Sequence, residues 1–397
     1  MKTIRWQLVL SACVLVSACG DNSTTGQPKE NEGAPARRAA LRSIAENVIV
    51  PTYREFRERA EALKTAAATL AADPSADNRA AAQAAWTEAT ALWQRAELLQ
   101  VGPAGVAGEV AGGKDLRDDI YAWPLLKPCL VDQTIVSKGY EAADFRDGSV
   151  SARTLSALEY LLFSESEENA CAANAEINAG GTWAALDAGE LRSRRAAYAA
   201  KTAELVHAAA DELVVAWEPA GGAFLESFAT GGAGSMVYAT SQDTLNALTD
   251  ALFYLEDATK DMKLGIPAGI TGCSDDVCPA LVEAPYASRS KEHIAENLRG
   301  FELAFLGGDA GASAKGIDDL LRDAGAGALA DDIASKTSAA TNAIEAVDGT
   351  FETALLTDYA QVETAYTALR DLVVLMKTEM MSVLDLELPA RVEADND

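Results

Sequence analysis

The sequence predicts an all-α protein built as two tandem helical bundles, and three observations support this fold class. Apolar side chains recur every three or four residues along most of the chain, which is the period of a helix face. Alternating patterns typical of strands are almost absent. Hydrophobic residues make up 49% of the chain, but aromatic residues only 6%, as in helices packed through small side chains. The length suits two domains of ordinary size.

The first bundle is expected at residues 41–234. One apolar stripe begins at Leu41 and continues to Leu70, and Pro51 should start or kink that helix. The other stripes of this half are Ala82 to Leu99, Leu155 to Leu162, and Leu191 to Trp217.

The second bundle is expected at residues 235–397, after the run Gly231-Gly232-Ala233-Gly234, which is typical of a boundary. Its stripes are Leu245 to Met262, Ile294 to Phe305, Leu329 to Val347, and Val362 to Val383. Two bundles in tandem are the simplest arrangement that buries all of these faces.

The N-terminus predicts a bacterial signal peptide at residues 1–18. Lys2 and Arg5 precede an apolar stretch from Trp6 to Ala18 that is too short to span a bilayer as a stable helix. Val16-Ser17-Ala18-Cys19 resembles the lipobox of exported lipoproteins, which makes Cys19 the expected lipidation site. Cys13 also follows two small residues, but cleavage there would leave too little apolar segment; a plain secretory signal is the other alternative.

Residues 19–40 are expected to form the lipidated cysteine and a flexible tether, because the segment after Cys19 is polar and rich in small residues. Gly20, rather than aspartate, follows the cysteine. By resemblance to the bacterial sorting rule, this favours the outer membrane. We therefore expect a periplasmic protein whose membrane contact is its lipid anchor.

The formal net charge of -27 constrains the partners of the protein. Such a surface repels nucleic acid and anionic lipid headgroups, and it attracts cations. Solubility alone explains most of the individual carboxylates.

The four cysteines of the body are Cys129, Cys171, Cys273 and Cys278. An even number in an oxidising compartment predicts two disulfides. Cys273 and Cys278 are close in the chain and should pair locally, which leaves Cys129 for Cys171. A thiolate metal site is the weaker alternative, because neither pair has the two-residue CxxC spacing.

Five segments together resemble the imelysin family, and their order along the chain is more specific than any one of them. They are Asn47-Val48-Ile49-Val50-Pro51, Trp93-Gln94-Arg95-Ala96-Glu97, Ile120-Tyr121-Ala122-Trp123-Pro124, Ala157-Leu158-Glu159-Tyr160, and Glu283-Ala284-Pro285-Tyr286 with Asn297-Leu298-Arg299-Gly300. The resemblance implies two helical bundles with a site between them, export, an association with bacterial iron uptake, and a metallopeptidase label.

The sequence departs from the family signature Gly-x-His-x-x-Glu. The aligned residues are Thr154, Ser156 and Glu159, so that only the glutamate remains. Histidine and glutamate three residues apart on a helix can share a metal ion. Serine and glutamate alone cannot hold a transition metal, although hard cations such as Fe³⁺ or Ca²⁺ prefer oxygen ligands.

We expect the site to be a polar cleft between the two halves. Glu159 interrupts an apolar helical run, where an unpaired charge would be costly. Glu97 lies beside a Gly-Pro turn, and Asp118 and Asp119 precede Trp123-Pro124. These carboxylates could gather around a hard cation. The alternative is that Glu159 pairs with Arg153 or Arg95 and the acids never meet.

His293 and Glu296 form a second candidate, an HxxE pair on a predicted helix. It could be a relocated pair of metal ligands, but a surface helix face explains the same spacing more easily.

The function we expect is that of an imelysin-like periplasmic lipoprotein of a metal-uptake system, with iron as the first candidate, binding a cation or a partner protein of that system. The alternatives are a metallopeptidase and a scaffold that has lost metal binding. The chain has no HExxH, no Gly-x-Ser-x-Gly, no Walker loop and no CxxCH haem motif. No catalytic residue is assigned, and peptidase activity is not expected.

Overall fold

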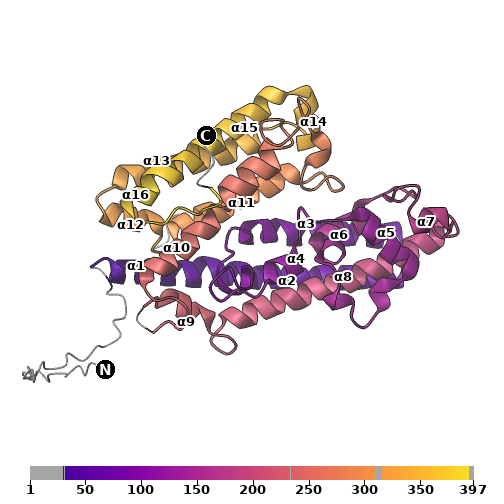
Figure 1. Cartoon of the computed structure of the whole chain (residues 1–397), viewed down its shortest axis with the longest axis horizontal. Helices are drawn as coiled ribbons and strands as arrows, with labels where there is room; N and C mark the ends of the chain where they lie inside the picture. Colours follow the sequence, from indigo (N-terminus) through magenta and orange to yellow (C-terminus); the bar gives the residue numbers. More distant parts are fainter. Residues whose placement is uncertain (1–29, 31, 233, 310–313, 393–397) are drawn as a thin grey trace, which may run out of the picture.

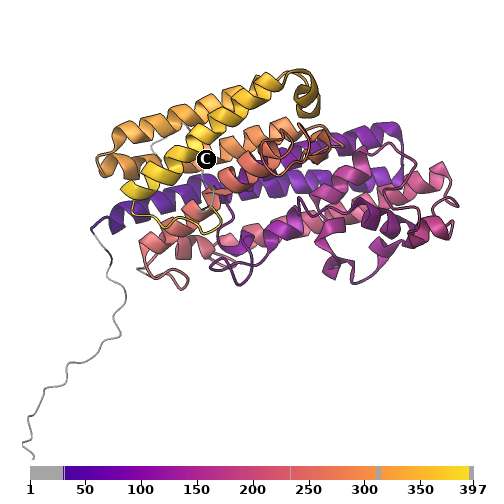
Figure 2. The same ribbon diagram turned by 45° about the horizontal axis from the view of Figure 1, so that its top comes forward.

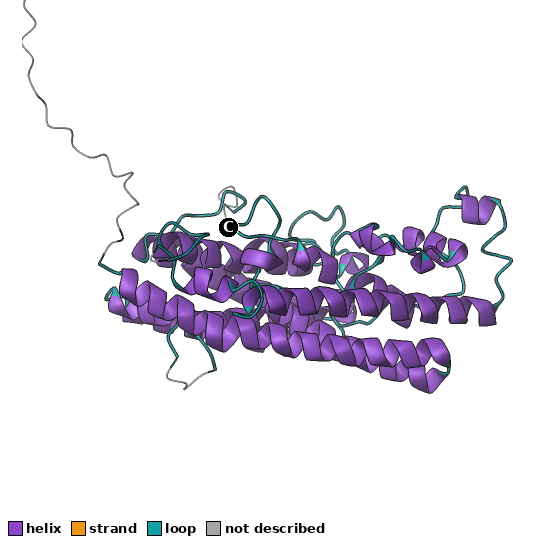
Figure 3. Cartoon of the chain, turned by 90° about the horizontal axis from the view of Figure 1, so that it is seen from below, coloured by secondary structure: helices purple, strands orange, loops and turns teal. Residues whose placement is uncertain are grey.

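The structure is a computed structural model that describes residues 30, 32–232, 234–309 and 314–392 (Figure 1). The described part is helical and contains no β-strand beyond one isolated bridge between Ala107 and Val110 (Figure 3). No helix in these residues has the length and apolar character needed to cross a membrane. The expected signal peptide, Cys19 and the sorting residue Gly20 lie outside the described residues.

The first half of the chain contributes three long helices, α2, α3 and α8, and many short ones. Its elements are α1 (Ala34–Ile44), η1 (Ala45–Ile49), α2 (Val50–Ala72), α3 (Ala76–Ala96), η2 (Gly102–Ala104), α4 (Leu116–Ile120), α5 (Pro128–Ser137), η3 (Gly139–Glu141), η4 (Phe145–Asp147), η5 (Val150–Ala152), α6 (Leu155–Phe163), α7 (Glu176–Ala179), α8 (Ala188–Trp217) and α9 (Phe224–Ala229).

The second half is built from helices of intermediate length and two π-helical segments. Its elements are α10 (Ser241–Leu252), η6 (Leu255–Gly265), η7 (Pro279–Leu281), α11 (Ser290–Leu306), α12 (Ile317–Asp323), α13 (Gly327–Glu345), α14 (Phe351–Thr357), α15 (Tyr359–Leu375), η8 (Met376–Met380) and α16 (Met381–Val383). The segments η1, η6 and η8 are π-helical.

The helices of the two halves lie in layers along the long axis of the molecule. In the first half α2 packs along both α8 and α3, and in the second half α13 packs along α15 (Figures 1 and 2). The layers are joined by α11, which packs against α3 on one side and α13 on the other. The two halves therefore share an extensive helical contact, and the candidate site lies at that contact.

The apolar stripes predicted from the sequence form the core. Phe56, Ala60, Leu63, Ala67 and Leu70 are buried along α2. The stripe of α3 is also buried, and its two tryptophans, Trp86 and Trp93, are among the largest fully buried side chains. The prediction of an all-α bundle protein is confirmed at this level.

The first helix begins at Ala34, inside the segment that we expected to be a tether up to residue 40. Pro35 occupies the first turn, where its missing N–H costs nothing. Arg37 donates from Nε to the hydroxyl of Ser241 (3.0 Å), and Glu30 accepts from the Ser241 backbone N–H (2.7 Å). These contacts with the second half order a segment whose composition alone indicated flexibility.

The chain passes from α1 to α2 through the π-helical turn η1, and Pro51 lies in the first turn of α2. Proline lacks an N–H, and its ring clashes with the carbonyl four residues earlier. The wider π turn immediately before Pro51 accommodates both effects while the helix continues. Pro51 therefore lies at the start of α2, as expected, while the helical chain runs on from α1 through η1 without interruption.

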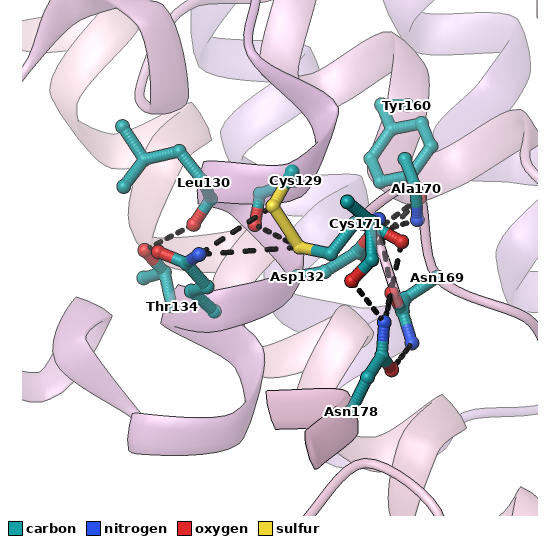
Figure 4. Close-up of a disulfide and its surroundings, with 11 residues drawn as sticks. Cys129, Leu130, Asp132, Thr134, Tyr160, Asn169, Ala170, Cys171 and Asn178 are labelled. Carbon is teal, nitrogen blue, oxygen red and sulfur yellow. Dashed lines mark hydrogen bonds between the residues drawn. A yellow bond between two sulfur atoms is a disulfide. The ribbon is translucent and has the colours of Figure 1, made fainter. Parts of the chain in front are cut away.

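Both expected disulfides are present. Cys129 and Cys171 join α5 to the loop after α6, and Cys273 and Cys278 close a short loop after η6. Figure 4 shows the first bridge beside Asn178, whose side-chain amide donates to the Cys171 carbonyl (3.2 Å). Four thiols are therefore unavailable for a thiolate metal site.

Candidate functional site between the helical halves

The centre of the site is Lys263, a lysine of η6 with a fully buried side chain. Its Nζ lies 2.5 Å from Gln94 Oε1, 2.9 Å from Asn297 Oδ1, 2.9 Å from Glu283 Oε1 and 3.2 Å from Glu97 Oε2. The ammonium group also faces the rings of Tyr254 (5.1 Å) and Trp123 (5.5 Å). We call these four acceptor oxygens and Lys263 the lysine cage.

The cage exists only because separate elements meet there. Gln94 and Glu97 come from the end of α3, Asn297 from α11 and Glu283 from the loop between η7 and α11. Asn297 also donates to the Gln94 carbonyl (2.7 Å), which fixes α11 against α3. The close approach of these two helices is possible because Gly300 faces the backbone of Arg95, where a Cβ would come within 2.3 Å of a carbonyl oxygen.

Both carboxylates of the cage have further partners. Glu97 accepts from Arg117 Nη2 (3.0 Å), and Glu283 accepts from Tyr121 OH (2.8 Å) and Gln94 Nε2 (2.9 Å). His293 Nδ1 lies 3.2 Å from the other oxygen of Glu283. Burial acts to raise the pKa of Glu283, but Lys263 and His293 outweigh it and hold that pKa below its ordinary value. The two buried carboxylates thus have cationic partners within direct contact: Lys263 contacts both, and Arg117 contacts Glu97.

Glu159 lies on α6 and is almost fully buried, which decides between the bundle interior and a flank, the two positions that its apolar neighbours allowed. Its Oε1 accepts from the backbone N–H groups of Tyr286 (2.8 Å) and Ala287 (3.0 Å). Burial raises the pKa of Glu159 to about 8, although these two hydrogen bonds act in the opposite direction. Glu159 therefore connects α6 by hydrogen bonds to the loop that carries Glu283.

The alternative partners considered for Glu159 are wrong. Arg153 donates to Asp119 (2.8 Å), and Arg95 pairs with Glu296 (2.8 Å). A sequence pattern of side chains could not reveal the real partners, because they are backbone amides from a loop far along the chain.

The other two signature positions are buried beside Glu159. The hydroxyl of Thr154 accepts from the backbone N–H of Ala122 (3.3 Å) at the start of α6. The hydroxyl of Ser156 is buried and has no hydrogen-bond partner among the described residues. The position that carries histidine in the family signature is thus buried, but in this chain its side chain offers only a serine hydroxyl.

The four predicted carboxylates do not gather around one point. Asp118 and Glu97 meet on the same guanidinium, since Arg117 Nη1 lies 2.9 Å from Asp118 Oδ1. Asp119 is held by Arg153 instead. Glu159 is bound by backbone amides. The described residues contain no group of three or more His, Cys, Asp or Glu side chains that could hold a metal ion.

The members of the HxxE pair also have different partners. His293 is buried against Glu283, and Glu296 pairs with Arg95 on α3. The surface interpretation of His293 is wrong, because His293 is buried and its ring lies 6.1 Å from the ring of Trp86 on α3.

Sequence reasoning missed the residues at the centre of the site. Lys263, Arg117 and Tyr121 were not singled out, and neither were Gln94, Glu283 and Asn297. Tyr121 and the last three stand within the segments that resemble the imelysin family, so polar residues inside those segments were the available signal.

A cavity of about 780 Å³ adjoins the cage. Arg117, Trp123 and Tyr254 belong both to its wall and to the surroundings of the cage. The first half contributes residues between 100 and 124, including Arg117 of α4, and the second half contributes residues of α10 and η6 together with Arg391. Its carboxylates are Glu109, Asp243, Asp250 and Asp257, and its bases are Arg117 and Arg391.

Arg391 bridges two of these carboxylates. Its Nε lies 2.6 Å from Asp257 Oδ2, and its Nη1 donates to Asp250. Burial raises the pKa of Asp257, while Arg391 acts to lower it. A positively charged group therefore already occupies the space between the two acids.

Comparison with known families shows to which family the chain belongs. The model of the family described as Imelysin, which carries the label Peptidase M75, matches residues 49–376. The chain belongs to the imelysin family. No curated protein matches the sequence.

Two solved structures share the fold of this imelysin-family chain. One, from Parabacteroides distasonis, is named as a putative iron-regulated protein A precursor. Its sequence identity to this chain is 16% and the TM-score is 0.66, and the match covers 91% of this chain and 96% of the other. The second is an imelysin-like protein from Psychrobacter arcticum, with 15% identity, a TM-score of 0.66, and coverage of 91% and 99%. At this identity the similarity establishes the fold.

The family label raises the question of a catalytic metal, and the donor set of this chain does not fit one. Ser156 replaces the signature histidine, and the Glu159 carboxylate is bound by two backbone amides. The nearby Glu97 and Glu283 surround an ammonium group. A catalytic zinc site needs several nitrogen, sulfur or oxygen ligands and an open position for water.

The raised pKa of Glu159 gives a testable pH dependence. A carboxylate whose folded pKa lies above its unfolded value of about 4.3 costs increasing stability as pH rises between the two. Glu159→Gln keeps the acceptor oxygen and removes the charge. We expect it to be more stable than the parent by about 1–3 kcal/mol at pH 8, with the difference vanishing near pH 4.

Urea denaturation from pH 4 to pH 8 measures this difference. Glu165→Gln removes an exposed carboxylate just beyond the same helix and should change stability by less than about 0.5 kcal/mol. The difference in stability between Glu159→Gln and the parent should therefore rise from pH 5 to pH 8. A difference that falls over this range would contradict the raised pKa of Glu159.

Proposed function

We propose that this chain is an exported, lipid-anchored imelysin-family protein of a metal-uptake system, and that the cavity between its halves binds a hard cation. The observation that supports the proposal is the acidic wall of that cavity, where Asp250 and Asp257 already hold the cationic group of Arg391. Hard cations prefer oxygen ligands of this kind. Iron is the first cation to test, because a protein of the same fold is named as iron-regulated.

Binding would require Arg391 to leave the two carboxylates. Arg391 belongs to the C-terminal segment, which rests on α10 through bonds from Gln242 to the carbonyls of Leu384 (3.1 Å) and Asp385 (2.9 Å). A cation that replaced the guanidinium would neutralise the same pair of acids. The partner protein of the uptake system would then meet a C-terminal segment in a different position.

The direct test is calorimetric titration with Ca²⁺ and with Fe³⁺ supplied as its citrate complex. We expect saturable binding that becomes at least about tenfold weaker in Asp250→Asn/Asp257→Asn, since each lost charged ligand costs about 1.5 kcal/mol or more. Arg391→Gln removes the internal competitor and should bind more tightly than the parent.

Asp371→Asn is the matched control, because that carboxylate pairs with Lys336 on the outer helices α13 and α15. Equal weakening in the control, or no saturable binding of either cation, would reject the cation proposal. The same preparations should not cleave an unstructured protein in a chelator-sensitive way; such cleavage, lost in Glu159→Ala, would restore the peptidase interpretation.

One observation favours a second candidate, a scaffold without metal. Lys263 occupies the middle of four acceptor oxygens, where its ammonium group takes the place that a metal cation would have. A buried network that is neutralised by the chain itself stabilises the contact between the halves without any ligand. Metal content after purification separates the two candidates.

Export and anchoring have their own test. Cys19→Ala should release the protein from the membrane fraction or block its maturation, because the lipid is attached at that thiol, and Cys13→Ala should have little effect. Fractionation of the cell envelope and mass spectrometry of the N-terminus make the measurement. An unmodified N-terminus in the parent would refute the anchor.

A further inference from the structure

A small cavity within the first half is lined by arginines. It has a volume of about 40 Å³ and lies where the end of α2, the start of α3, the end of α6 and the first turns of α8 meet. Its lining residues are Leu70, Pro74, Arg79, Leu161, Arg192, Arg195 and Ala196. Three guanidinium groups around one small space are unusual in a chain with a net charge of -27.

The backbone contacts of these arginines account for only part of their donors. Arg79 donates from Nε to the Leu162 carbonyl (2.7 Å) and from Nη2 to the Ser164 carbonyl (2.9 Å). Arg195 donates from Nη1 to the same Ser164 carbonyl (3.3 Å). Two arginines thus bind the C-terminal carbonyls of α6, where a positive charge is favourable.

Arg195 has donors left over. Its side chain is only 8% exposed, and its Nε and Nη2 are buried without an acceptor among the described residues. A buried guanidinium donor without a partner is costly, because its desolvation is not compensated. Capping of α6 needs only Nη1, so it does not explain the other two donors.

No carboxylate within the described part of the chain forms an ion pair with Arg79, Arg192 or Arg195. The charge of Asp132 raises the pKa of Arg195 without a hydrogen bond between them. Both oxygens of Asp132 accept from Tyr160 OH (3.1 and 3.0 Å), and one also accepts from the Ala170 N–H (2.7 Å), as Figure 4 shows. Glu167 also acts on Arg195 only through space. Burial lowers the pKa of Arg195, and Arg79 lowers it further. The cluster is therefore short of negative charge.

We propose that this arginine pocket binds a single oxyanion group, a phosphate or a carboxylate. Guanidinium donors match the oxygens of both groups, and charged hydrogen bonds gain strength beside the apolar walls of Leu70, Leu161 and Ala196. The cavity is close to the size of one small group, since a water molecule fills about 30 Å³. Pro74 and Arg192 are exposed, so the rest of a larger molecule would extend into solvent.

The site is separate from the cation proposal, because it shares no residue with the large cavity. An exported protein with this pocket could take the phosphate or carboxylate group of a small molecule or of a partner chain. The test therefore uses the isolated groups, inorganic phosphate and acetate, which share the oxyanion chemistry and differ in charge and shape.

Calorimetric titration of the whole mature chain at low ionic strength, with phosphate and acetate in separate runs, measures binding. We expect a dissociation constant below about 1 mM for at least one anion, and binding at least tenfold weaker in Arg195→Gln. Arg192→Gln, an exposed position that the fold does not need, should weaken binding by about threefold to tenfold. Preference for phosphate or acetate identifies the class of ligand.

Arg194→Gln is the matched control. It is adjacent in α8 and changes the net charge equally, but its guanidinium bonds Glu190 (2.7 Å) and the Val136 carbonyl (2.8 Å) away from the pocket. Equal weakening in Arg194→Gln would show a general effect of charge and overturn the proposal. Absence of saturable binding of both anions to the parent would also overturn it, as would unchanged binding in Arg192→Gln and Arg195→Gln together.

Discussion

Replacing Lys263 by methionine should destabilise the protein by about 3–5 kcal/mol at pH 7, which is the cost of leaving a buried charge without its partner. The variant keeps most of the side-chain volume but leaves Glu97 and Glu283 facing each other without the ammonium group between them. Of these two carboxylates, Arg117 directly contacts only Glu97. Urea denaturation followed by circular dichroism measures the loss.

Lys336→Met is the matched control for this prediction. Lys336 also forms an ion pair, with Asp371 at 2.8 Å, but its side chain is 43% exposed. An exposed pair contributes at most about 1 kcal/mol. Equal losses in the two variants would show that the lysine cage does not stabilise the contact between the halves.

The pH dependence of Lys263→Met provides a second readout. In the parent, the lowered pKa of Glu283 gives stability that is complete above the unfolded value of about 4.3 and is lost as pH falls through the folded pKa. Without Lys263, burial should raise that pKa above the unfolded value. The loss should then be smaller at pH 5 than at pH 8, and Glu283→Gln in the same background should recover part of it.

Replacing Cys129 and Cys171 together by serine should cost about 4 kcal/mol in the chain-entropy model. The bridge spans a sequence separation of 42 residues, so its loss greatly increases the freedom of the unfolded chain. It also holds the loop after α6 beside the Asp132, Asn169 and Asn178 hydrogen bonds (Figure 4). Thermal and urea denaturation of the oxidised parent and the variant measure the difference.

The second disulfide is the internal comparison. Cys273 and Cys278 are separated by only 5 residues, and the same model gives about 2 kcal/mol for the loss of that bridge. A larger cost for Cys273→Ser/Cys278→Ser than for Cys129→Ser/Cys171→Ser would contradict the dependence on loop length. The order of the two values is more informative than either value alone.

The amino-acid sequence by itself determined the helical architecture and the disulfides. The stripe from Phe56 to Leu70 and the two tryptophans of α3 mark helix faces because side chains three and four residues apart share one side of a helix. Cysteine pairing followed from number and spacing. The apolar neighbours of Glu159 along α6 singled it out as a carboxylate near the bundle, because an unpaired charge in an apolar run is costly.

The tertiary structure decided the partners at the site. Glu159 is bound by backbone amides at positions 286 and 287, and a backbone amide leaves no trace in the residue type. Lys263 looks like any lysine of an amphipathic helix until α3, α11 and the Glu283 loop surround it. Local spacing fixes which face of one helix is apolar. It does not fix which residues of distant helices meet, because that depends on packing and charge balance between whole elements.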